Sequence, residues 1–238
     1  MIEFLFLDLD DTILDFHAAE QVAIRQTLRQ FGLEPTEEVL DAYHRINKWH
    51  WQQLELGNLT RNQVLEGRFQ ALFAETDIQA DSAACAGAYT EDLSHCCQFI
   101  PGALEALEAL RKKYRLYLAS NGTAWVQRRR IAGAELAPYF EDIFISQELG
   151  HNKPSRDYFD ACFARIPRFD PAQAMIVGDS LSSDILGGIN AGIRTCWVNP
   201  GHAQAPEGLQ PDLEIEDLSQ LEALLEDQKN TCLFGWYP

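Results

Sequence analysis

The pattern of hydrophobic positions changes character along the chain. Residues 2–7 are apolar except at Glu3, without alternation, which is typical of a strand buried on both faces of a central parallel sheet. The next 80 residues or so contain no good strand candidate, and their apolar residues recur at helical spacing instead. Four consecutive helices are expected, over residues 17–31, 36–56, 60–73 and 81–95. A run of four helices directly after one strand predicts a helical subdomain and not a simple crossover connection.

From Pro101 onward, short apolar strands alternate with helices of about ten residues. The expected strands are 115–120, 142–146, 174–179, 194–199 and an edge strand at 212–215; the expected helices are 103–113, 125–132, 155–165, 186–191 and 218–225. This alternation predicts βαβ units, and therefore a parallel sheet with right-handed crossovers. The tail, residues 228–238 with Phe234, Trp236 and Tyr237, fits neither pattern.

Length and charge narrow the class of protein. The chain has 238 residues, enough for one large domain or two modest ones, and its formal net charge is −17. That charge argues against nucleic acid polymers and anionic membranes as partners, and it requires local positive charge wherever an anionic substrate binds. No apolar run approaches the roughly 20 residues that span a bilayer, and no basic region precedes the first apolar run, so neither a membrane anchor nor a secretory signal is expected. A cytoplasmic protein, monomer or homodimer, is expected.

The six cysteines show no spacing typical of a zinc site. Several of them lie in apolar surroundings, so we expect buried free thiols in a reducing compartment.

Acidic side chains gather where the first strand ends. Asp8, Asp10, Asp11 and Thr12 follow the apolar run directly, and Asp8 and Asp10 lean to the same side if the extended geometry persists. Open parallel sheets bind their ligands at the carboxyl ends of their strands. Several carboxylates there would repel one another without a cation. This stretch is therefore interpreted as an active site that holds a metal ion.

Polar residues also follow two later strands. One ends in Ser120-Asn121-Gly122 and another in Gly178-Asp179-Ser180, with Asp184 five residues further on; Lys153 precedes a helix between them. Each has a structural explanation by itself: a turn, a helix N-cap, a surface lysine or an exposed helical aspartate. Their joint occurrence at strand ends and a helix start favours one shared active site.

These four motifs resemble those of the haloacid dehalogenase superfamily, in that family's order, and the inserted helices resemble its helical cap. The resemblance implies an α/β fold: a Rossmann-like parallel-sheet core, residues 1–15 and 99–238, with an inserted helical cap subdomain, residues 16–98. It implies a phosphatase in which Asp8 attacks phosphorus to form an aspartyl-phosphate. Asp8 needs no base for this, because an unperturbed carboxylate is ionised at neutral pH. Asp10 would act as general acid and then base.

The same resemblance assigns the remaining roles. Asp8, the backbone carbonyl of Asp10 and Asp179 would bind Mg²⁺, with Mn²⁺ as an alternative. Lys153 would offset negative charge, and Asp184 would orient Lys153 or a metal-bound water. Thr12 would fix the turn. Ser120 and the N–H of Asn121 would donate hydrogen bonds to the phosphoryl oxygens, and Gly122 would allow the backbone to approach them closely.

The substrate is suggested by the cap. Trp49 and Trp51 cannot share one helix face, so at most one of them is expected in the core. Tryptophans on such a helix usually serve packing, but an aromatic ring with Lys and Asn nearby also suits a flat, polar base, and Trp51 is the candidate. Several cap positions resemble bacterial pyrimidine 5′-nucleotidases of the house-cleaning type in this superfamily: Asn47-Lys48, Trp51, Gly57, Thr60, Gln63 and Arg68-Phe69. So do residues 183–192 and 195–197 of the core. The resemblance implies hydrolysis of UMP, dUMP or dTMP. The alternatives are a sugar-phosphate or phosphoglycolate phosphatase, a phosphomutase and an inactive scaffold that binds phosphorylated ligands.

Overall fold

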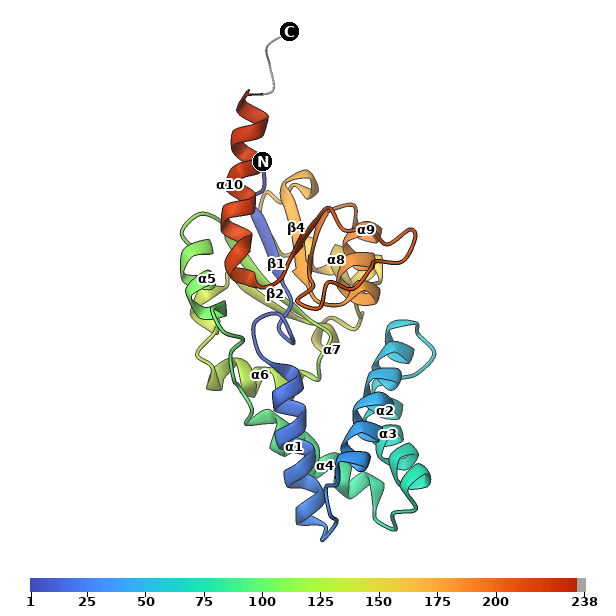
Figure 1. The fold of residues 1–238 in the computed structure, drawn as a ribbon. Coiled ribbons are helices and arrows are strands. Elements are labelled where there is room, and N and C mark those ends of the chain that lie inside the picture. The colour runs from blue at the N-terminus through green and yellow to red at the C-terminus, as the bar shows by residue number, and fades with distance from the viewer. Residues whose placement is uncertain (235–238) are drawn as a thin grey trace. The chain divides into compact units, whose positions relative to one another are not determined.

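The computed structural model describes the backbone of residues 1–234 and the side chains of residues 1–227 (Figure 1). The chain divides into two compact units. The core unit contains residues 1–15, 99–124 and the chain from 134 onward, and the helical unit contains residues 16–98 and 125–133. The aromatic residues Trp236 and Tyr237 of the tail lie outside the described residues.

The core unit is built on one sheet, which has six parallel strands within the described residues, in the order β3-β2-β1-β4-β5-β6. Their bounds are β1 Phe4–Leu7, β2 Arg115–Ser120, β3 Asp142–Ile145, β4 Ala174–Gly178, β5 Arg194–Val198 and β6 Leu213–Ile215. All four residues of β1 are buried, as expected for a central strand with both faces covered. The expected α/β Rossmann-like fold, including its edge strand, is confirmed.

Helices cover both faces of the sheet (Figure 1). On one face, Phe4 and Phe6 of β1 belong to an apolar cluster with Tyr158 and Phe159 of α8 (Arg156–Phe163) and with part of α9 (Leu186–Ala191). On the other face lie α5 (Ala103–Leu110) and α10 (Leu221–Phe234). Because side chains alternate along a strand, Asp8 follows Phe4 and Phe6 on the same side of β1.

Short elements complete the core unit. They are α7 (Ser146–Leu149), the 3₁₀ turns η1 (Ala137–Tyr139), η2 (Pro171–Gln173) and η4 (Leu218–Gln220), and the π-helical turn η3 (Leu181–Ile185). The backbone of α10 continues past Leu225, where the expected last helix ended, to Phe234.

The helical unit contains α1 (Phe16–Gln30), α2 (Glu37–Glu55), α3 (Arg61–Thr76), α4 (Ser82–Ser94) and most of α6 (Ala124–Gly133). Three of these helices begin at polar residues that cap them. The Thr36 side chain accepts from the N–H of Val39, and Asp81 accepts from two N–H groups of α4. Thr60 and Gln63 form a capping box, in which each side chain accepts from the backbone N–H of the other.

The sequence-based division placed residues 125–133 in the core, and the structure differs here. Val126 of α6 belongs to the apolar cluster of the helical unit. Arg130, 1% exposed, donates from Nε to the Cys96 carbonyl at 2.8 Å, and Arg129 donates to Glu91 at 2.8 Å. These contacts attach α6 to the helical unit, although the chain on both sides of it belongs to the core unit.

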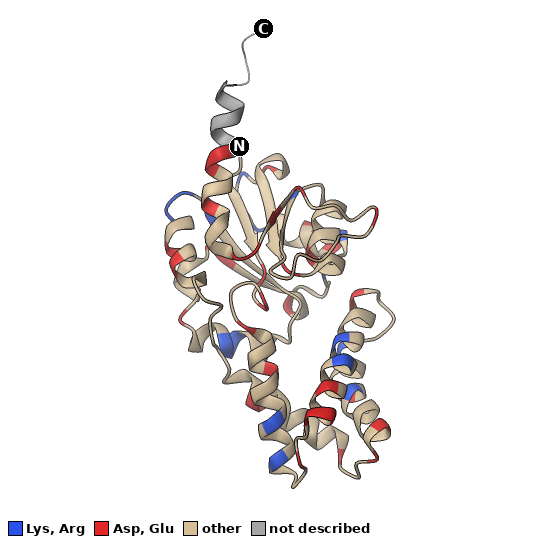
Figure 2. Ribbon diagram, in the orientation of Figure 1, with Lys and Arg blue, Asp and Glu red and all other residues tan. Residues whose placement is uncertain are grey.

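Charge and thiols complete the description. Figure 2 shows acidic residues on elements of both units, in agreement with 36 Asp and Glu against 19 Lys and Arg. Among the described side chains, five cysteines are free thiols and four of those are buried, as expected; the side chain of Cys232 lies outside this set. No helix in the described part of the chain has an apolar stretch long enough to cross a bilayer.

Candidate active site

The candidate site begins where β1 ends. The Asp8 N–H donates to the Val177 carbonyl at 2.9 Å, which continues the pairing of β1 with β4 by one residue. The chain then turns sharply: Asp11 has φ 53°, in the left-handed region, and its N–H donates to the Leu14 carbonyl at 2.8 Å. The Asp8 side chain is left at the carboxyl edge of the sheet, 7% exposed.

Lys153 contacts Asp8 directly. Its ammonium nitrogen Nζ lies 2.5 Å from Asp8 Oδ1, 2.6 Å from Asp184 Oδ1 and 2.7 Å from the Ala119 carbonyl oxygen. An ammonium group has three protons to donate, so these three acceptors satisfy it fully. Lys153 is 1% exposed, which excludes the surface lysine considered from the sequence.

Asn121 holds the backbone of Lys153 in place. Its Oδ1 accepts from the Lys153 N–H at 2.8 Å, and its Nδ2 donates to the Lys153 carbonyl at 2.9 Å and to Ser183 Oγ at 3.1 Å. Ser120, which is buried, accepts from the Gly122 N–H at 3.1 Å through its Oγ. The end of β2 is therefore joined to the lysine loop and to η3.

The carboxylates that follow β4 approach Asp8. Oxygens of Asp8, Asp179 and Asp184 all lie within 4.8 Å of one another. Asp184 is 0% exposed, and its second oxygen, Oδ2, accepts from the Ser180 N–H at 3.1 Å. Gly178 makes room for this side chain, since a Cβ at position 178 would lie 2.1 Å from Asp184 Oδ2. Asp184 lies on the π-helical turn η3, a type of helix that is frequent at functional sites.

Burial and mutual repulsion govern the ionisation of these groups. Burial raises the pKa of Asp8 to about 8, the charges of Asp184 and Asp10 add to the rise, and Lys153 opposes it. Burial, followed by the charges of Asp184 and Asp8, raises the pKa of Asp179 well above its usual value. Burial disfavours the Lys153 ammonium, but the carboxylates of Asp184 and Asp8 more than offset this and raise its pKa. One lysine does not neutralise three aspartates.

The donor set fits a magnesium ion. The clustered oxygens are hard ligands, and a divalent cation would compensate the negative charge that the carboxylates carry once they release their protons. Asp184 is the least available of the three, because both of its oxygens already accept hydrogen bonds. Asp8 and Asp179 are therefore the two residues of this cluster whose carboxylate oxygens are best placed to bind a metal ion.

The other expected site residues differ in position. Asp10 lies close enough for its charge to raise the pKa of Asp8, and its backbone forms a bridge with Leu14. Thr12 is buried, its Oγ1 has no hydrogen-bond partner among the described residues, and backbone bonds close the turn; a role of Thr12 in fixing that turn stays a prediction. Trp51 is half-buried in the helical unit, with the Arg61 guanidinium 5.6 Å from its ring centroid.

Three contributions were not expected from the sequence. They are the Asn121 side chain as a clamp on Lys153, the Ser183 hydroxyl beside it, and the Ala119 carbonyl that accepts from the lysine. The Ser120-Asn121-Gly122 motif indicated that Asn121 lies at the site, but not that its side chain holds the backbone of Lys153. The Ala119 carbonyl has no signal in the sequence, because any residue type could supply it.

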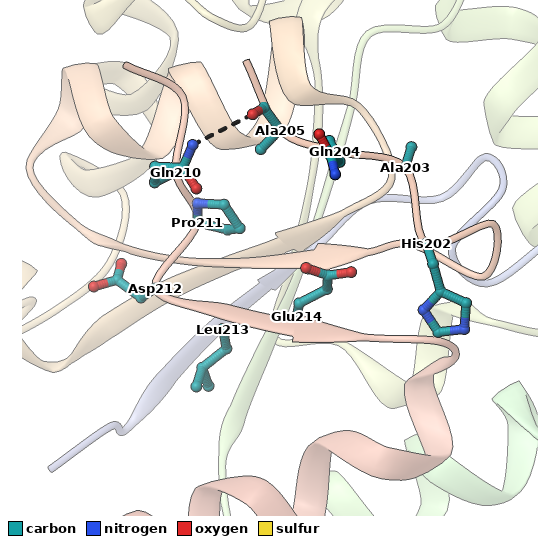
Figure 3. Close-up of a pocket in the computed structure, with 9 residues that line it drawn as sticks. All are labelled: His202, Ala203, Gln204, Ala205, Gln210, Pro211, Asp212, Leu213 and Glu214. Carbon is teal, nitrogen blue, oxygen red and sulfur yellow. Dashed lines mark hydrogen bonds between the residues drawn. The ribbon is translucent and has the colours of Figure 1, made fainter. Parts of the chain in front are cut away.

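A separate cavity of about 580 Å³ lies between the loop from His202 to Gln210 and strand β6 (Figure 3). Its polar groups already hold this loop together: Gln210 donates to the Ala205 carbonyl at 3.3 Å, and Asp212 accepts from Thr195 N–H at 2.8 Å. It contains none of the clustered aspartates and is not the candidate site.

Comparison with known proteins agrees with this geometry. Residues 2–192 match the family model of haloacid dehalogenase-like hydrolases. The chain is 36% identical to the pyrimidine 5′-nucleotidase PynA of Streptococcus pneumoniae (92% of this chain, 93% of PynA) and 31% identical to the pyrimidine 5′-nucleotidase YjjG of Escherichia coli (94% and 97%). The structure of the hydrolase YfnB of Bacillus subtilis bound to magnesium superimposes with a TM-score of 0.90, at 38% identity, over 94% of this chain and 98% of YfnB. The chain therefore belongs to the haloacid dehalogenase-like hydrolases and is an enzyme of that family.

Proposed function

We propose that this enzyme is a Mg²⁺-dependent phosphomonoester hydrolase that forms an aspartyl-phosphate on Asp8 and acts on pyrimidine nucleoside 5′-monophosphates. The observation that carries the chemistry is the buried group at the carboxyl edge of the sheet, where the Lys153 ammonium joins Asp8 to Asp184. A permanently placed cation beside a carboxylate suits a nucleophile that must approach a phosphate dianion.

In the first half of the proposed reaction, Asp8 attacks phosphorus. Lys153 donates to Asp8 Oδ1, and one oxygen of this carboxylate forms the new O–P bond while the bond from phosphorus to the leaving oxygen breaks. Asp10 donates a proton to that oxygen, and the nucleoside leaves as an alcohol. Lys153 stays within hydrogen-bond distance of Asp8 and offsets charge on the phosphoryl oxygens.

In the second half, a water molecule attacks the aspartyl-phosphate, and Asp10, now a carboxylate, accepts its proton. The O–P bond to Asp8 breaks, phosphate leaves, and Asp10 returns to its protonated form. Ser120 and the Asn121 N–H would donate to the phosphoryl oxygens, with Gly122 permitting close approach. The bonds and protons balance over the cycle, so that one water is consumed for each ester hydrolysed.

Asp8, Asp179 and the Asp10 carbonyl would hold the Mg²⁺, with Mn²⁺ as a possible substitute. The ion would supply Lewis-acid compensation of negative charge on the phosphoryl group. Mg²⁺ prefers oxygen ligands and keeps several waters, which agrees with the small number of carboxylates left to bind it here.

The proposal of a pyrimidine nucleotide substrate rests on the relatives PynA and YjjG, each similar along almost its full length. Within the chain, Trp51 is the proposed contact for the base. An aromatic ring beside a cation, here Arg61 at 5.6 Å, offers a flat surface together with positive charge.

The test is phosphate release, with and without Mg²⁺, from UMP, dUMP, dTMP, purine nucleotides and sugar phosphates. We expect metal-dependent turnover that is highest with the pyrimidine nucleotides and is abolished by Asp8→Asn. Turnover of sugar phosphates alone would overturn the substrate, and dependence on a bisphosphate would indicate a phosphomutase. Residual activity of Asp8→Asn above a few per cent of wild type would overturn the assignment of Asp8 as the nucleophile. An absence of turnover on every ester would favour the phospho-ligand scaffold.

A further inference from the structure

A second group of potential metal ligands lies within the helical unit. His17 and Glu20 belong to α1, and His44 belongs to α2. One donor atom from each of the three lies within 4.8 Å of the other two. None of these residues belongs to the core unit or to the proposed phosphatase mechanism.

Glu20 is the anchor of this group. It is 1% exposed, and its two oxygens are held by different partners: Asn47 Nδ2 lies 2.6 Å from Oε1, and His44 Nδ1 lies 2.6 Å from Oε2. Asn47 is held in turn by Arg68 Nη1, which donates to its Oδ1 at 2.8 Å. A buried carboxylate fixed through an amide by a buried cation is the outer support that protein metal ligands commonly have.

The two histidines lie on the solvent side of Glu20. His17 precedes Glu20 by three residues, so both project from the same face of α1. The rings of His17 and His44 meet edge to face, with centroids 5.1 Å apart. The His44 side chain is 45% exposed and His17 is exposed, so an ion could reach them from solvent and both rings have room to adjust.

We infer that His17, Glu20 and His44 form a transition-metal site, distinct from the carboxylate cluster of the core, with Zn²⁺ as the best-matched ion. Two imidazoles and one carboxylate make a three-ligand zinc site whose fourth position is open to water. Imidazole ligands favour zinc and its neighbours, whereas Mg²⁺ prefers oxygen ligands.

The geometry is close to what zinc requires. Zinc–nitrogen and zinc–oxygen bonds of about 2.0–2.2 Å place tetrahedral ligand atoms about 3.3 Å apart. The His44 Nδ1 to Glu20 Oε2 distance of 2.6 Å must therefore open by less than about 1 Å, and the proton between them must leave. Glu20 is fixed, so the exposed His44 ring makes that movement.

Zinc titration by calorimetry, in the presence of saturating Mg²⁺, tests the site. Wild type should bind one equivalent with an affinity that falls at least tenfold in His17→Ala and in His44→Ala. His202→Ala is the matched control, because His202 also faces a glutamate, Glu216 at 3.4 Å, but lies outside the cluster. Asp179→Asn separates the two sites, and it should leave zinc binding unchanged. His17 is exposed, so the metal-free unfolding temperature of His17→Ala should match wild type; His44→Ala also removes a hydrogen-bond partner of the buried Glu20 and should lower that temperature.

Zinc affinity equal to wild type in both histidine variants would show that Glu20 and His44 form a plain hydrogen bond. Zinc binding lost in Asp179→Asn but kept in His17→Ala would assign it to the core carboxylates. Either result overturns the site, and neither bears on phosphatase activity. Titration with Co²⁺ adds a spectroscopic readout, because nitrogen coordination should produce visible absorption that the His17→Ala variant lacks.

Discussion

The side-chain amide of Asn121 is hydrogen-bonded to both backbone polar groups of Lys153. Its Oδ1 accepts from the N–H at 2.8 Å, and its Nδ2 donates to the carbonyl at 2.9 Å. The ammonium of the same lysine then lies 2.5 Å from Asp8 Oδ1. Asn121 therefore fixes the backbone from which Lys153 reaches Asp8, the proposed nucleophile, although Asn121 and Lys153 are 32 positions apart.

Asn121→Ala removes both of these bonds and should lower kcat about 10- to 100-fold. Each buried hydrogen bond that is lost costs about 1–3 kcal/mol, and about 1.4 kcal/mol corresponds to a factor of ten in rate. The loss should appear in kcat more than in KM, since Lys153 would be displaced from the reacting carboxylate. Steady-state kinetics on the preferred phosphate ester measures it.

Asn190→Ala is the control for this prediction. The Asn190 amide donates to the carbonyl of Pro154, one residue after Lys153, at 3.0 Å, but it is exposed and contacts neither Lys153 backbone group. Its activity should remain close to wild type. Equal losses in the two variants would mean that the loop needs only general support, and the clamp would lose its specific role.

Gly178→Ala should impair both stability and turnover. The added Cβ would lie 2.1 Å from Asp184 Oδ2 and 2.9 Å from Asp184 Cβ, and Asp184 is fully buried, so it cannot move aside without breaking its bond to Lys153. Overpacking of this kind costs about 1–3 kcal/mol in the free energy of unfolding. Chemical denaturation and phosphatase assays measure the two effects.

Gly201→Ala is the matched substitution in the same unit, because a Cβ there meets no atom within 4 Å. Its free energy of unfolding should stay within about 0.5 kcal/mol of wild type. A stable and active Gly178→Ala protein would show that Asp184 has another position from which it can hold Lys153.

The strands and the main acidic residues could be predicted from the sequence for a physical reason. Buried parallel strands leave unbroken apolar runs, and the residues after each run must meet at one edge of the sheet. That reasoning identified the positions of Asp8 and Asp179, whereas Lys153 was identified by its place in the set of motifs that resembles the family. It could not identify the Asn121 clamp or the space that Gly178 leaves for Asp184, because these depend on how loops distant in sequence meet.

The assignment of α6 failed for a related reason. The spacing of its apolar residues predicts a helix, and the structure has one. The helix lies between two segments of the core unit in the sequence, so it was predicted to belong to that unit as well. Its partners are in the helical unit: Arg130 donates to the carbonyl of Cys96, 34 positions earlier. Contacts of that range are not encoded in local spacing.

Binding of Mg²⁺ should release protons and weaken as the pH falls. The pKa of Asp8 is raised to about 8 and that of Asp179 is raised well above its usual value, in both cases chiefly by burial. Below pH 8 the metal-free cluster therefore carries protons that Mg²⁺ must displace. Affinity should fall by about tenfold per pH unit for each proton released. Calorimetry at neutral pH, in two buffers of different ionisation enthalpy, counts those protons.

Asp179→Asn removes one titrating ligand, so it should reduce both the Mg²⁺ affinity and the number of protons released. An Mg²⁺ affinity that stays constant from pH 8 down to pH 6 in wild type would contradict the raised pKa values. It would mean that Lys153 alone keeps the cluster ionised before the metal arrives.

Trp51→Leu should raise KM for pyrimidine nucleotides and leave turnover of a small phosphate ester, such as p-nitrophenyl phosphate, unchanged. Trp51 is half-buried, with Arg61 over its ring at 5.6 Å, and the proposed role is to contact the base and not the phosphate. Removing one aromatic contact of this kind costs about 1–3 kcal/mol, and therefore roughly tenfold or more in KM.

Trp49→Leu is the control, since Trp49 lies two residues earlier on α2 and is 52% exposed. Because side chains two apart on a helix point in different directions, the two variants separate base recognition from general packing of α2. Equal KM increases for both ester types in Trp51→Leu would assign the residue to packing, and a nucleotide-specific effect in Trp49→Leu would transfer the base contact to the opposite face of the helix.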